Sequence, residues 1–342
     1  DVYKRQGVKT FQAEDEIAAV GTAVGAAFAG SLAATTTSGP GLALKSESIS
    51  LAFMMELPLI VIDVQRAGPS TGMPTRVEQS DLLFAMYGRH GEAPLPVLAA
   101  ATPADAFSTA IEAARIATKY MTPVILLSDG YVANSSEPWL IPDVEDLPQF
   151  PVDFATQPND GDDFLPYVRD PVTMARPWAI PGTPGLEHRL GGLEKQNRTG
   201  AVAYDGANHE LMTELRAAKI EAIRKDIPPI TVHGDADAKV LVLGWGSTFG
   251  AIRAGVLNAR RQGLSVAHAQ IRHLNPLPPD LGDVLKGREV VLVPELNAGQ
   301  FSKLIRAEYL VDAVTLSKMQ GDPFKSGEIE DKLVEICRGL NS

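Results

Sequence analysis

Residues 35–47 read Thr-Thr-Thr-Ser-Gly-Pro-Gly-Leu-Ala-Leu-Lys-Ser-Glu, and they separate a short run that favours a strand from the apolar run Ile49–Met55, which favours a helix. Hydroxyl groups and glycines gather at this expected strand-to-helix turn, where backbone N–H groups can meet a ligand. Two phosphate-binding motifs fail here. No glycine directly precedes Lys45-Ser46, and Leu44 stands where the third glycine of G-x-G-x-x-G belongs. The turn is therefore expected to bind another kind of ligand.

Around this turn, expected strands and helices alternate. Glu14–Gly30 is rich in helix formers and small residues, so we expect a helix that packs close to a neighbour or a ligand. The near-continuous apolar runs Leu57–Val64 and Val124–Ser128 are typical of buried parallel strands. Pro103–Tyr120 between them has helical periodicity. The pattern predicts an α/β fold with an open parallel sheet in a first domain, residues 7–150.

The chain then changes character. Pro151–Gly200 holds seven prolines and six glycines, which predicts a lid or an interface arm within a second region, residues 151–236, that ends with a helix at His209–Lys225. A second α/β domain, residues 237–342, is predicted from alternating strands and helices at 239–244, 250–262, 265–270, 289–294 and 300–310. Gly244-Trp245-Gly246 is interpreted as a tight turn, since its spacing departs from a dinucleotide fingerprint.

Composition excludes several classes of protein. The net charge of −11 argues against nucleic acid or an anionic membrane as the main partner, and the 45% hydrophobic content is that of a globular, cytoplasmic protein. The one cysteine, Cys337, excludes a disulfide framework and a complete iron–sulfur site within this chain, and we interpret it as an ordinary helix residue. The first residues, Asp1–Gln6, are expected to be a fragment end or a cloning remnant.

Charged residues at two element ends are the candidates for chemistry. Arg66 follows the predicted strand Leu57–Val64 and opens a Gly/Ser/Thr/Pro loop, a placement that suits recognition of a carboxylate or phosphate but also a structural ion pair. Glu14 opens the predicted small-residue helix, where a carboxylate also suits the helix dipole. Five nearby charged residues are interpreted as dipole or surface groups, namely Asp15, Glu16, Arg76, Arg89 and His90.

Three segments in order resemble the α subunits of the 2-oxoacid:ferredoxin oxidoreductases, those acting on 2-oxoglutarate in particular. They are Gln12–Glu16, Thr36–Gly41 and Gln65–Thr75. Two later segments, His273–Pro278 and Glu295–Gln300, resemble the second domain of the same subunits. The resemblance implies a thiamine-diphosphate pyrimidine-binding domain over residues 7–150, followed by a transketolase C-terminal-like domain over residues 237–342.

The same resemblance implies roles for individual residues. Glu14 matches the glutamate that hydrogen-bonds the aminopyrimidine ring of thiamine diphosphate and promotes formation of its carbanion. The cofactor cavity would be lined by Ser38, Gly39, Pro40 and Gly41. Arg66 and Thr75 match positions that hold the 2-oxoacid, with Arg66 at a carboxylate. The sequence assigns no metal ligand in this chain.

The implied reaction is the oxidative decarboxylation of 2-oxoglutarate with coenzyme A to succinyl-CoA, CO₂ and reduced ferredoxin. The diphosphate and Mg²⁺ signature, Gly-Asp-Gly with a distal Asn, is absent. Ser128-Asp129-Gly130 is only superficially similar to its first part and lacks the distal Asn. The resemblance therefore implies a β subunit that carries the diphosphate, Mg²⁺ and iron–sulfur sites, in a dimer of heterodimers. The family's Tyr-Pro-Ile-Thr-Pro motif is also absent, and we expect it upstream of residue 1.

Other functions stay open at this stage. A paralogue acting on branched-chain or aryl 2-oxoacids would carry the same motifs, and a non-catalytic transketolase-like interaction module would share the fold. Glu14 and Arg66 in one pocket would favour the enzyme, whereas separate faces would favour the module.

Overall fold

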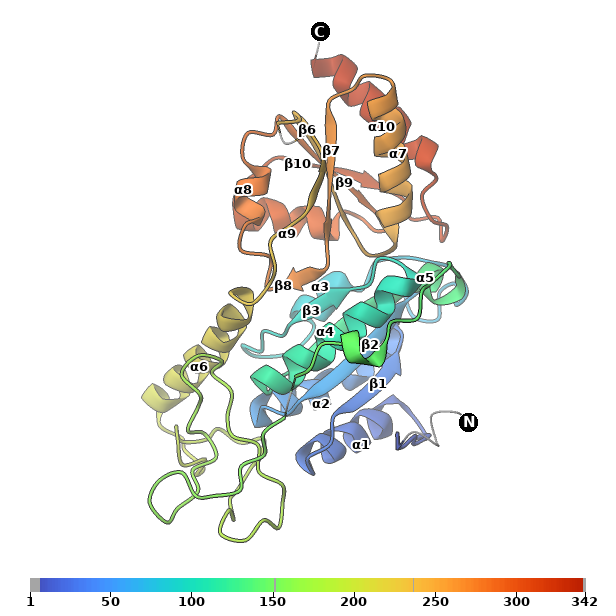
Figure 1. Ribbon diagram of the computed structural model, residues 1–342. Helices are drawn as coiled ribbons and strands as arrows, with labels where there is room; N and C mark the ends of the chain where they lie inside the picture. Colours follow the sequence, from blue (N-terminus) through green and yellow to red (C-terminus); the bar gives the residue numbers. More distant parts are fainter. Residues whose placement is uncertain (1–6, 151, 236, 341–342) are drawn as a thin grey trace.

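The computed structural model describes residues 7–150, 152–235 and 237–340, and it contains two five-stranded sheets (Figure 1). The first sheet has the order β1-β2-β4-β3-β8, in which four strands run parallel and β8 pairs antiparallel to β3. Its strands are β1 (Ala33–Thr37), β2 (Leu59–Gln65), β3 (Val97–Ala99), β4 (Pro123–Asp129) and β8 (His273–Asn275). The predicted α/β fold with an open parallel sheet is confirmed.

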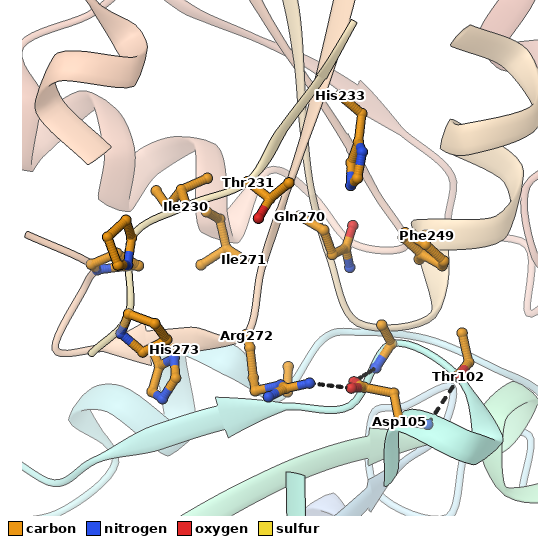
Figure 2. Close-up of a pocket in the computed structure, with 15 residues that line it drawn as sticks. Thr102, Asp105, Ile230, Thr231, His233, Phe249, Gln270, Ile271, Arg272 and His273 are labelled. Atoms are coloured by element: carbon orange, nitrogen blue, oxygen red, sulfur yellow. Dashed lines mark hydrogen bonds and ion pairs between the residues drawn. The ribbon is translucent and has the colours of Figure 1, made fainter. Parts of the chain in front are cut away.

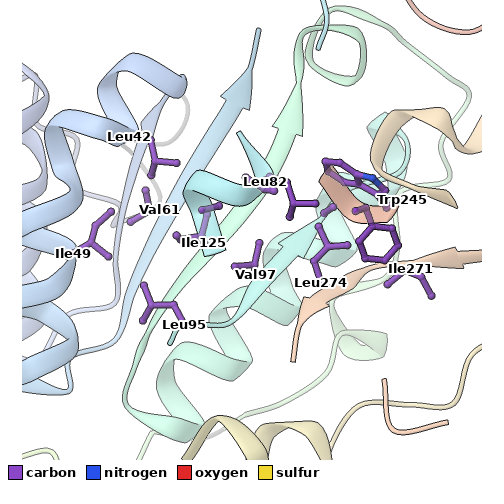
Figure 3. Close-up of a cluster of buried hydrophobic side chains, with 14 of the residues drawn as sticks. Leu42, Ile49, Val61, Leu82, Leu95, Val97, Ile125, Trp245, Ile271 and Leu274 are labelled. Carbon is purple, nitrogen blue, oxygen red and sulfur yellow. The ribbon is translucent and has the colours of Figure 1, made fainter. Parts of the chain in front are cut away.

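Helices cover both faces of the first sheet because its strands are apolar on both sides. Val61 and Ile125 pack with the first two helices, as Figure 3 shows, whereas Ile60 and Val124 point to the opposite face and pack against α4. This two-residue alternation is the expected geometry of a strand. The helices of this half are α1 (Glu16–Phe28), α2 (Gly39–Met55), α3 (Leu82–Tyr87), α4 (Pro103–Tyr120) and α5 (Gly130–Asn134).

The second sheet is also parallel apart from one edge strand. Its order is β10-β9-β6-β7-β5, with β5 antiparallel at the edge. Helices α8 and α9 pack on one face, and α7 and α10 on the other (Figure 1). The strands are β5 (Val232–Gly234), β6 (Val240–Trp245), β7 (Val266–Ile271), β9 (Val290–Glu295) and β10 (Ala313–Ser317). The helices are α7 (Phe249–Arg261), α8 (Leu281–Leu285), α9 (Gln300–Tyr309) and α10 (Ser326–Leu340), and Cys337 is buried in α10.

The proline- and glycine-rich region forms long loops that lead into α6 (Gly206–Arg224), after a short 3₁₀ turn at Val144–Asp146. A buried carboxylate, Glu56, at the end of α2 anchors these loops through ion pairs with Arg169 of the loops and Lys219 of α6. Burial would raise the pKa of Glu56, but the two cations outweigh this effect and lower it. The region is therefore attached to the first sheet by buried charge pairs.

The two sheets are linked through β8, which the sequence did not predict. Residues 273–275 come from the second half of the chain but complete the first sheet, and Trp245 and Leu82 belong to one continuous core (Figure 3). The division of the chain at residues 150 and 236 stays a prediction, and β8 lies across it.

Two predicted helix starts are wrong. The first helix begins at Glu16 instead of Glu14, because Asp15 is its N-cap and accepts a hydrogen bond from the Ala18 amide at 2.7 Å. The second begins at Gly39, ten residues before Ile49, with a proline in its first turn. In the part of the chain that the structure describes, no helix is both long and apolar enough to cross a membrane.

Candidate active site

The predicted site residues follow two neighbouring parallel strands. β1 leads into the Ser38–Gly41 turn and β2 leads into Arg66, and Thr37 lies opposite Asp63 in the register of the two strands. Because parallel neighbours end at the same edge of a sheet, both segments emerge together. This carboxyl edge is where open α/β sheets bind their ligands.

Ser38 ends β1 and caps α2 without using its side chain. Its backbone is extended, with φ −128° and ψ 175°, and its carbonyl accepts a hydrogen bond from the Leu42 amide at 2.9 Å. Its hydroxyl makes no cap hydrogen bond. The hydroxyl of Ser38 is therefore available to a ligand at the start of α2.

The two glycines of the turn are required by contacts within the chain. A Cβ on Gly41 would lie 1.9 Å from Thr37 Oγ1 and 2.7 Å from Glu16 Cγ. A Cβ on Gly39 would lie 2.6 Å from Asp81 Oδ1. The start of α2 is thus packed directly against the start of α1 and against the loop before α3, which only glycine permits.

Glu14 lies one residue before the N-cap of α1, and its side chain is exposed. It has no hydrogen-bond or ion-pair partner among residues 7–150, 152–235 and 237–340. The adjoining helix start is fixed by Lys45, which is buried in α2 and donates a hydrogen bond from Nζ to the Glu16 carbonyl at 2.8 Å. Burial lowers the pKa of Lys45, and Glu16 and Asp15 oppose this effect. Among the described residues, Glu14 thus presents an unpaired carboxylate from a helix start that two hydrogen bonds hold in place.

The loop between Arg66 and Thr75 is closed by backbone hydrogen bonds. The Ala67 amide donates to the Arg76 carbonyl at 3.0 Å, and the Met73 amide donates to the Ala67 carbonyl at 2.9 Å. The loop therefore folds back on itself, with Arg66 just before it and Thr75 near its end. Thr75 is exposed, whereas Arg66 is half-buried and its buried Nε has no hydrogen-bond partner in the part of the chain that the structure describes.

The predicted site segments contact one another in a row along the edge of the first sheet, and they do not surround a common space. Gly41 contacts Glu16, Gly39 contacts Asp81, and Arg66 lies close enough to Asp81 to lower its pKa, against the larger raising effect of burial. No hydrogen bond or ion pair joins Glu14 to Arg66 directly. Both ends of the row lie at the carboxyl edge of the first sheet.

Neighbouring charged residues have structural roles. Arg76 pairs with Asp322 of the second half at 2.7 Å, and both are about half exposed. Arg89 donates to the carbonyls of Ala85, Met86 and Ala93. The exposed Arg76 pair agrees with its interpretation as a surface residue, whereas Arg89 is half-buried and bonded to the end of α3 and the loop after it.

A separate cavity of about 370 Å³ lies between the two sheets (Figure 2). Thr102 and Asp105 line it from the first half of the chain, and Thr231, Phe249 and Arg272 from the second, with an Arg272–Asp105 ion pair at its floor. None of the predicted site residues lines this cavity.

The two later motifs hold the halves of the chain together. Glu295 is fully buried and accepts hydrogen bonds from the Phe301 and Ser302 amides, so it caps α9. Gln79 is also buried and bonds to Trp245 and Leu296 of the second half, at 3.0 and 3.1 Å. Sequence reasoning missed Gln79, since a single glutamine in a loop gives no signal of its partners.

The Ser128-Asp129-Gly130 segment begins a helix. Asp129 Oδ1 accepts hydrogen bonds from the Tyr131 and Val132 amides, both at 3.0 Å, so this carboxylate is the N-cap of α5. Within the described ranges, no group of three or more His, Cys, Asp or Glu side chains could hold a metal ion.

Comparison with known proteins shows which proteins this chain is similar to. Residues 1–204 match the family model described as pyruvate flavodoxin/ferredoxin oxidoreductase, thiamine diphosphate-binding. A curated relative from Mycobacterium tuberculosis strain H37Rv, 2-oxoglutarate oxidoreductase subunit KorA, is 54% identical over 96% of this chain and 50% of its own length. The chain spans about half the length of several curated relatives that it matches.

Two solved structures share the fold. The 2-oxoglutarate:ferredoxin oxidoreductase from Magnetococcus marinus, described with 2-oxoglutarate, coenzyme A and succinyl-CoA bound, superposes with a TM-score of 0.91 at 37% identity, over 97% of this chain and 58% of its own. A split-gene transketolase, described as an inactive β4 tetramer, superposes with a TM-score of 0.52 at 10% identity, over 94% of this chain and 81% of its own. The second likeness concerns the fold alone.

Proposed function

Because this chain belongs to the α-subunit family of the 2-oxoacid:ferredoxin oxidoreductases, we propose that it forms part of an enzyme that oxidatively decarboxylates 2-oxoglutarate. Coenzyme A would accept the acyl group to give succinyl-CoA, and ferredoxin would accept the electrons. The observation that carries this proposal is the meeting of the Glu14, Ser38–Gly41 and Arg66–Thr75 segments at one sheet edge.

The residues at this edge fit the pyrimidine half of thiamine diphosphate. The carboxylate of Glu14 has no partner in the described part of the chain, and the hydroxyl of Ser38 makes no cap hydrogen bond, so an acceptor and a donor are both available. Ile17 of α1 and Leu44 of α2 are about half exposed and offer apolar surface to a ring. When bound, thiamine diphosphate supplies the carbon nucleophile that adds to the 2-oxoacid carbonyl and stores the electrons left when CO₂ departs.

Glu14 is assigned the acid–base role in this chain. Its carboxylate would accept a hydrogen bond from a pyrimidine ring nitrogen and stabilise the tautomer in which the exocyclic nitrogen can take a proton. A rigid support makes this role effective, because a positioned group loses little freedom during reaction. The Asp15 cap and the Lys45–Glu16 hydrogen bond provide that support.

Arg66 and Thr75 are assigned to the 2-oxoacid. A guanidinium binds a carboxylate through two parallel N–H donors, and the Arg66 Nε has no competing partner among the described residues. Thr75, near the end of the same loop, would add one hydroxyl contact.

A β subunit is required for the remaining chemistry. This chain has one cysteine, Cys337, which is buried in α10, so the iron–sulfur cluster that passes electrons to ferredoxin must be held elsewhere. We assign the diphosphate, Mg²⁺ and cluster sites to the β subunit, in a dimer of heterodimers in the cytoplasm. Exposure of Glu14 and Thr75 supports an active site that a partner completes.

The proposed function is tested by the products of the co-purified complex. Supplied with coenzyme A, a viologen dye and a panel of 2-oxoacids, the complex should form succinyl-CoA from 2-oxoglutarate faster than any other acyl-CoA. Branched-chain or aryl acyl-CoA as the main product would assign a different substrate. No acyl-CoA from any 2-oxoacid would contradict the proposal, and the isolated chain should reduce no dye.

A further inference from the structure

Two carboxyl groups face each other beneath the Gly39 turn. Asp63 lies on β2 and is fully buried, and both of its oxygens lack a hydrogen-bond donor among the described residues. Its neighbour is the carboxyl group of Asp81, which precedes α3, and the two side chains are within hydrogen-bonding reach. Asp81 makes no cap hydrogen bond to α3, and its buried Oδ2 also lacks a donor.

The surrounding groups do not neutralise this pair. Gln65 does not donate to Asp63: its Nε2 donates to the Ser128 carbonyl and its Oε1 accepts from the Asp81 amide, and neither Asp63 oxygen has a donor among the described residues. The charged groups that face the pair are Arg66 from the end of β2 and Glu78 from the loop before α3. One cation therefore faces three carboxyl groups, and two ionised carboxylates in contact within a buried site repel each other strongly.

We propose that Asp63 and Asp81 share one proton, that Asp63 is the protonated partner and donates a hydrogen bond to ionised Asp81, and that this pair positions Arg66 and the Gly39 turn. A single proton gives both carboxyl groups a partner. It also leaves one negative charge, on Asp81, which is the residue that touches Gly39 and faces Arg66.

Burial decides which of the two carboxyl groups holds the proton. Burial raises the pKa of Asp63 well above its usual range, and the adjoining Asp81 raises it further. Burial also raises the pKa of Asp81, to about 6, with the Asp63 hydrogen bond acting against it. Asp63, the more deeply buried of the two, therefore holds the proton, and Asp81 is the ionised partner. The positioning role rests on the proposed function, whereas the shared proton does not.

The shared proton is tested by counting the protons released when the full-length protein unfolds at pH 8. Wild type should release about one proton more than Asp63→Asn, because an unfolded aspartic acid ionises at that pH. Asp283→Asn is the matched control, since Asp283 is exposed and pairs with Lys286 on the surface of α8. It should release as many protons as wild type. Equal release from wild type, Asp63→Asn and Asp283→Asn would overturn the shared proton.

An infrared spectrum provides a second measurement on the native protein. Wild type at pH 8 should show the C=O band of a protonated carboxylic acid, and Asp63→Asn should lack it. If Asp63→Asn fails to fold, the band in wild type still decides. Absence of the band, together with a melting temperature that rises with added Na⁺ or Mg²⁺, would show a bound cation in place of the proton.

The positioning role is tested in the complex by steady-state kinetics. Asp81→Asn should raise the KM for 2-oxoglutarate roughly tenfold and change kcat less, because Arg66 loses the charge that orients it. The fall in kcat/KM as pH drops through about 6 in wild type should be absent in this variant. An unchanged KM and pH profile would overturn the positioning role. A wild-type complex without 2-oxoacid activity would overturn the proposed function. The number of protons released on unfolding would still test the Asp63–Asp81 pair, because it does not depend on activity.

Discussion

The amide nitrogen of Ala67 donates a hydrogen bond to the carbonyl oxygen of Arg76 at 3.0 Å, and this bond closes the loop that follows β2. Arg66 lies just before Ala67 and Thr75 just before Arg76, so this bond fixes the two ends of the loop that separates them. The loop backbone is also bonded internally through Met73, and the second half of the chain braces it, since the Val77 amide donates to the Gly321 carbonyl at 3.2 Å and Arg76 pairs with Asp322.

Arg66→Lys should weaken catalysis although the charge is kept. Lysine lacks the planar fork of arginine, and loss of one charge-assisted hydrogen bond costs roughly 1.5–3 kcal/mol, or about 10- to 150-fold in kcat/KM. Steady-state kinetics on 2-oxoglutarate and 2-oxobutyrate assign the contact. A larger loss on 2-oxoglutarate places Arg66 at the distal carboxylate, and equal losses place it at the carboxylate that both substrates share.

Arg76→Lys is the control for this substitution. Arg76 lies in the same loop, but its ion pair with Asp322 is about half exposed and is worth little. Its kcat/KM should stay within about twofold of wild type. If Arg66→Lys shows no loss on either substrate, Arg66 does not bind the 2-oxoacid.

Gly41→Ala should destabilise the protein by about 3 kcal/mol or more, because the new methyl group would lie 1.9 Å from Thr37 Oγ1. Gly21→Ala on the exposed side of α1 should instead stabilise it by about 0.5–1 kcal/mol, since nothing lies within 4 Å and alanine favours a helix. Thermal unfolding of both variants checks the contrast. Equal melting temperatures would mean that α1 and α2 do not pack as described.

His268 should make the protein acid-sensitive. Burial on β7 lowers its pKa from 6.5 to about 4, and His233 and Arg253 add to this effect while Gln270 opposes it. Between these values the unfolded chain binds a proton that the folded chain does not, so stability falls as pH drops from 6.5 towards 4, by about 3 kcal/mol in total.

Urea unfolding at several pH values checks this slope. His268→Phe, which is neutral at every pH, should lose most of it, whereas substitution of the exposed His90 by Gln should leave it unchanged. A wild-type slope retained in His268→Phe would assign the acid sensitivity to other groups.

Local patterns predicted much of the fold. The bounds of α4 agree with its helical periodicity at both ends, since Thr102 caps its first turn and Met121 ends it in the left-handed region. The start of α2 was missed although its signals, Ser38 as cap and Pro40 after it, are local. That prediction placed the helix by its apolar residues and gave too little weight to the capping residues before them.

Long-range contacts could not be predicted. β8 has three residues, and only its pairing with β3, far away in the sequence, defines it as a strand. For the candidate site, the motifs indicated which segments to examine, whereas the contact of Gly39 with Asp81 depends on how β1, β2 and α3 pack. Such contacts are properties of the folded chain, not of any one segment.

The central claim is that this chain supplies the carboxylate that acts on thiamine diphosphate. Glu14→Gln keeps the shape of the side chain and removes its charge, and loss of a positioned acid–base group costs about 10²–10⁴ in rate. Asp15→Asn is the neighbouring control, since asparagine is as good an N-cap as aspartate and the helix start should persist.

The deciding measurement is the rate of C2–H exchange of thiamine diphosphate bound to the reconstituted complex, followed by hydrogen–deuterium exchange. We expect exchange in Glu14→Gln to be slower by about 10²–10⁴ at an unchanged melting temperature, and exchange in Asp15→Asn to stay near wild type. An exchange rate in Glu14→Gln close to that of wild type would contradict the claim.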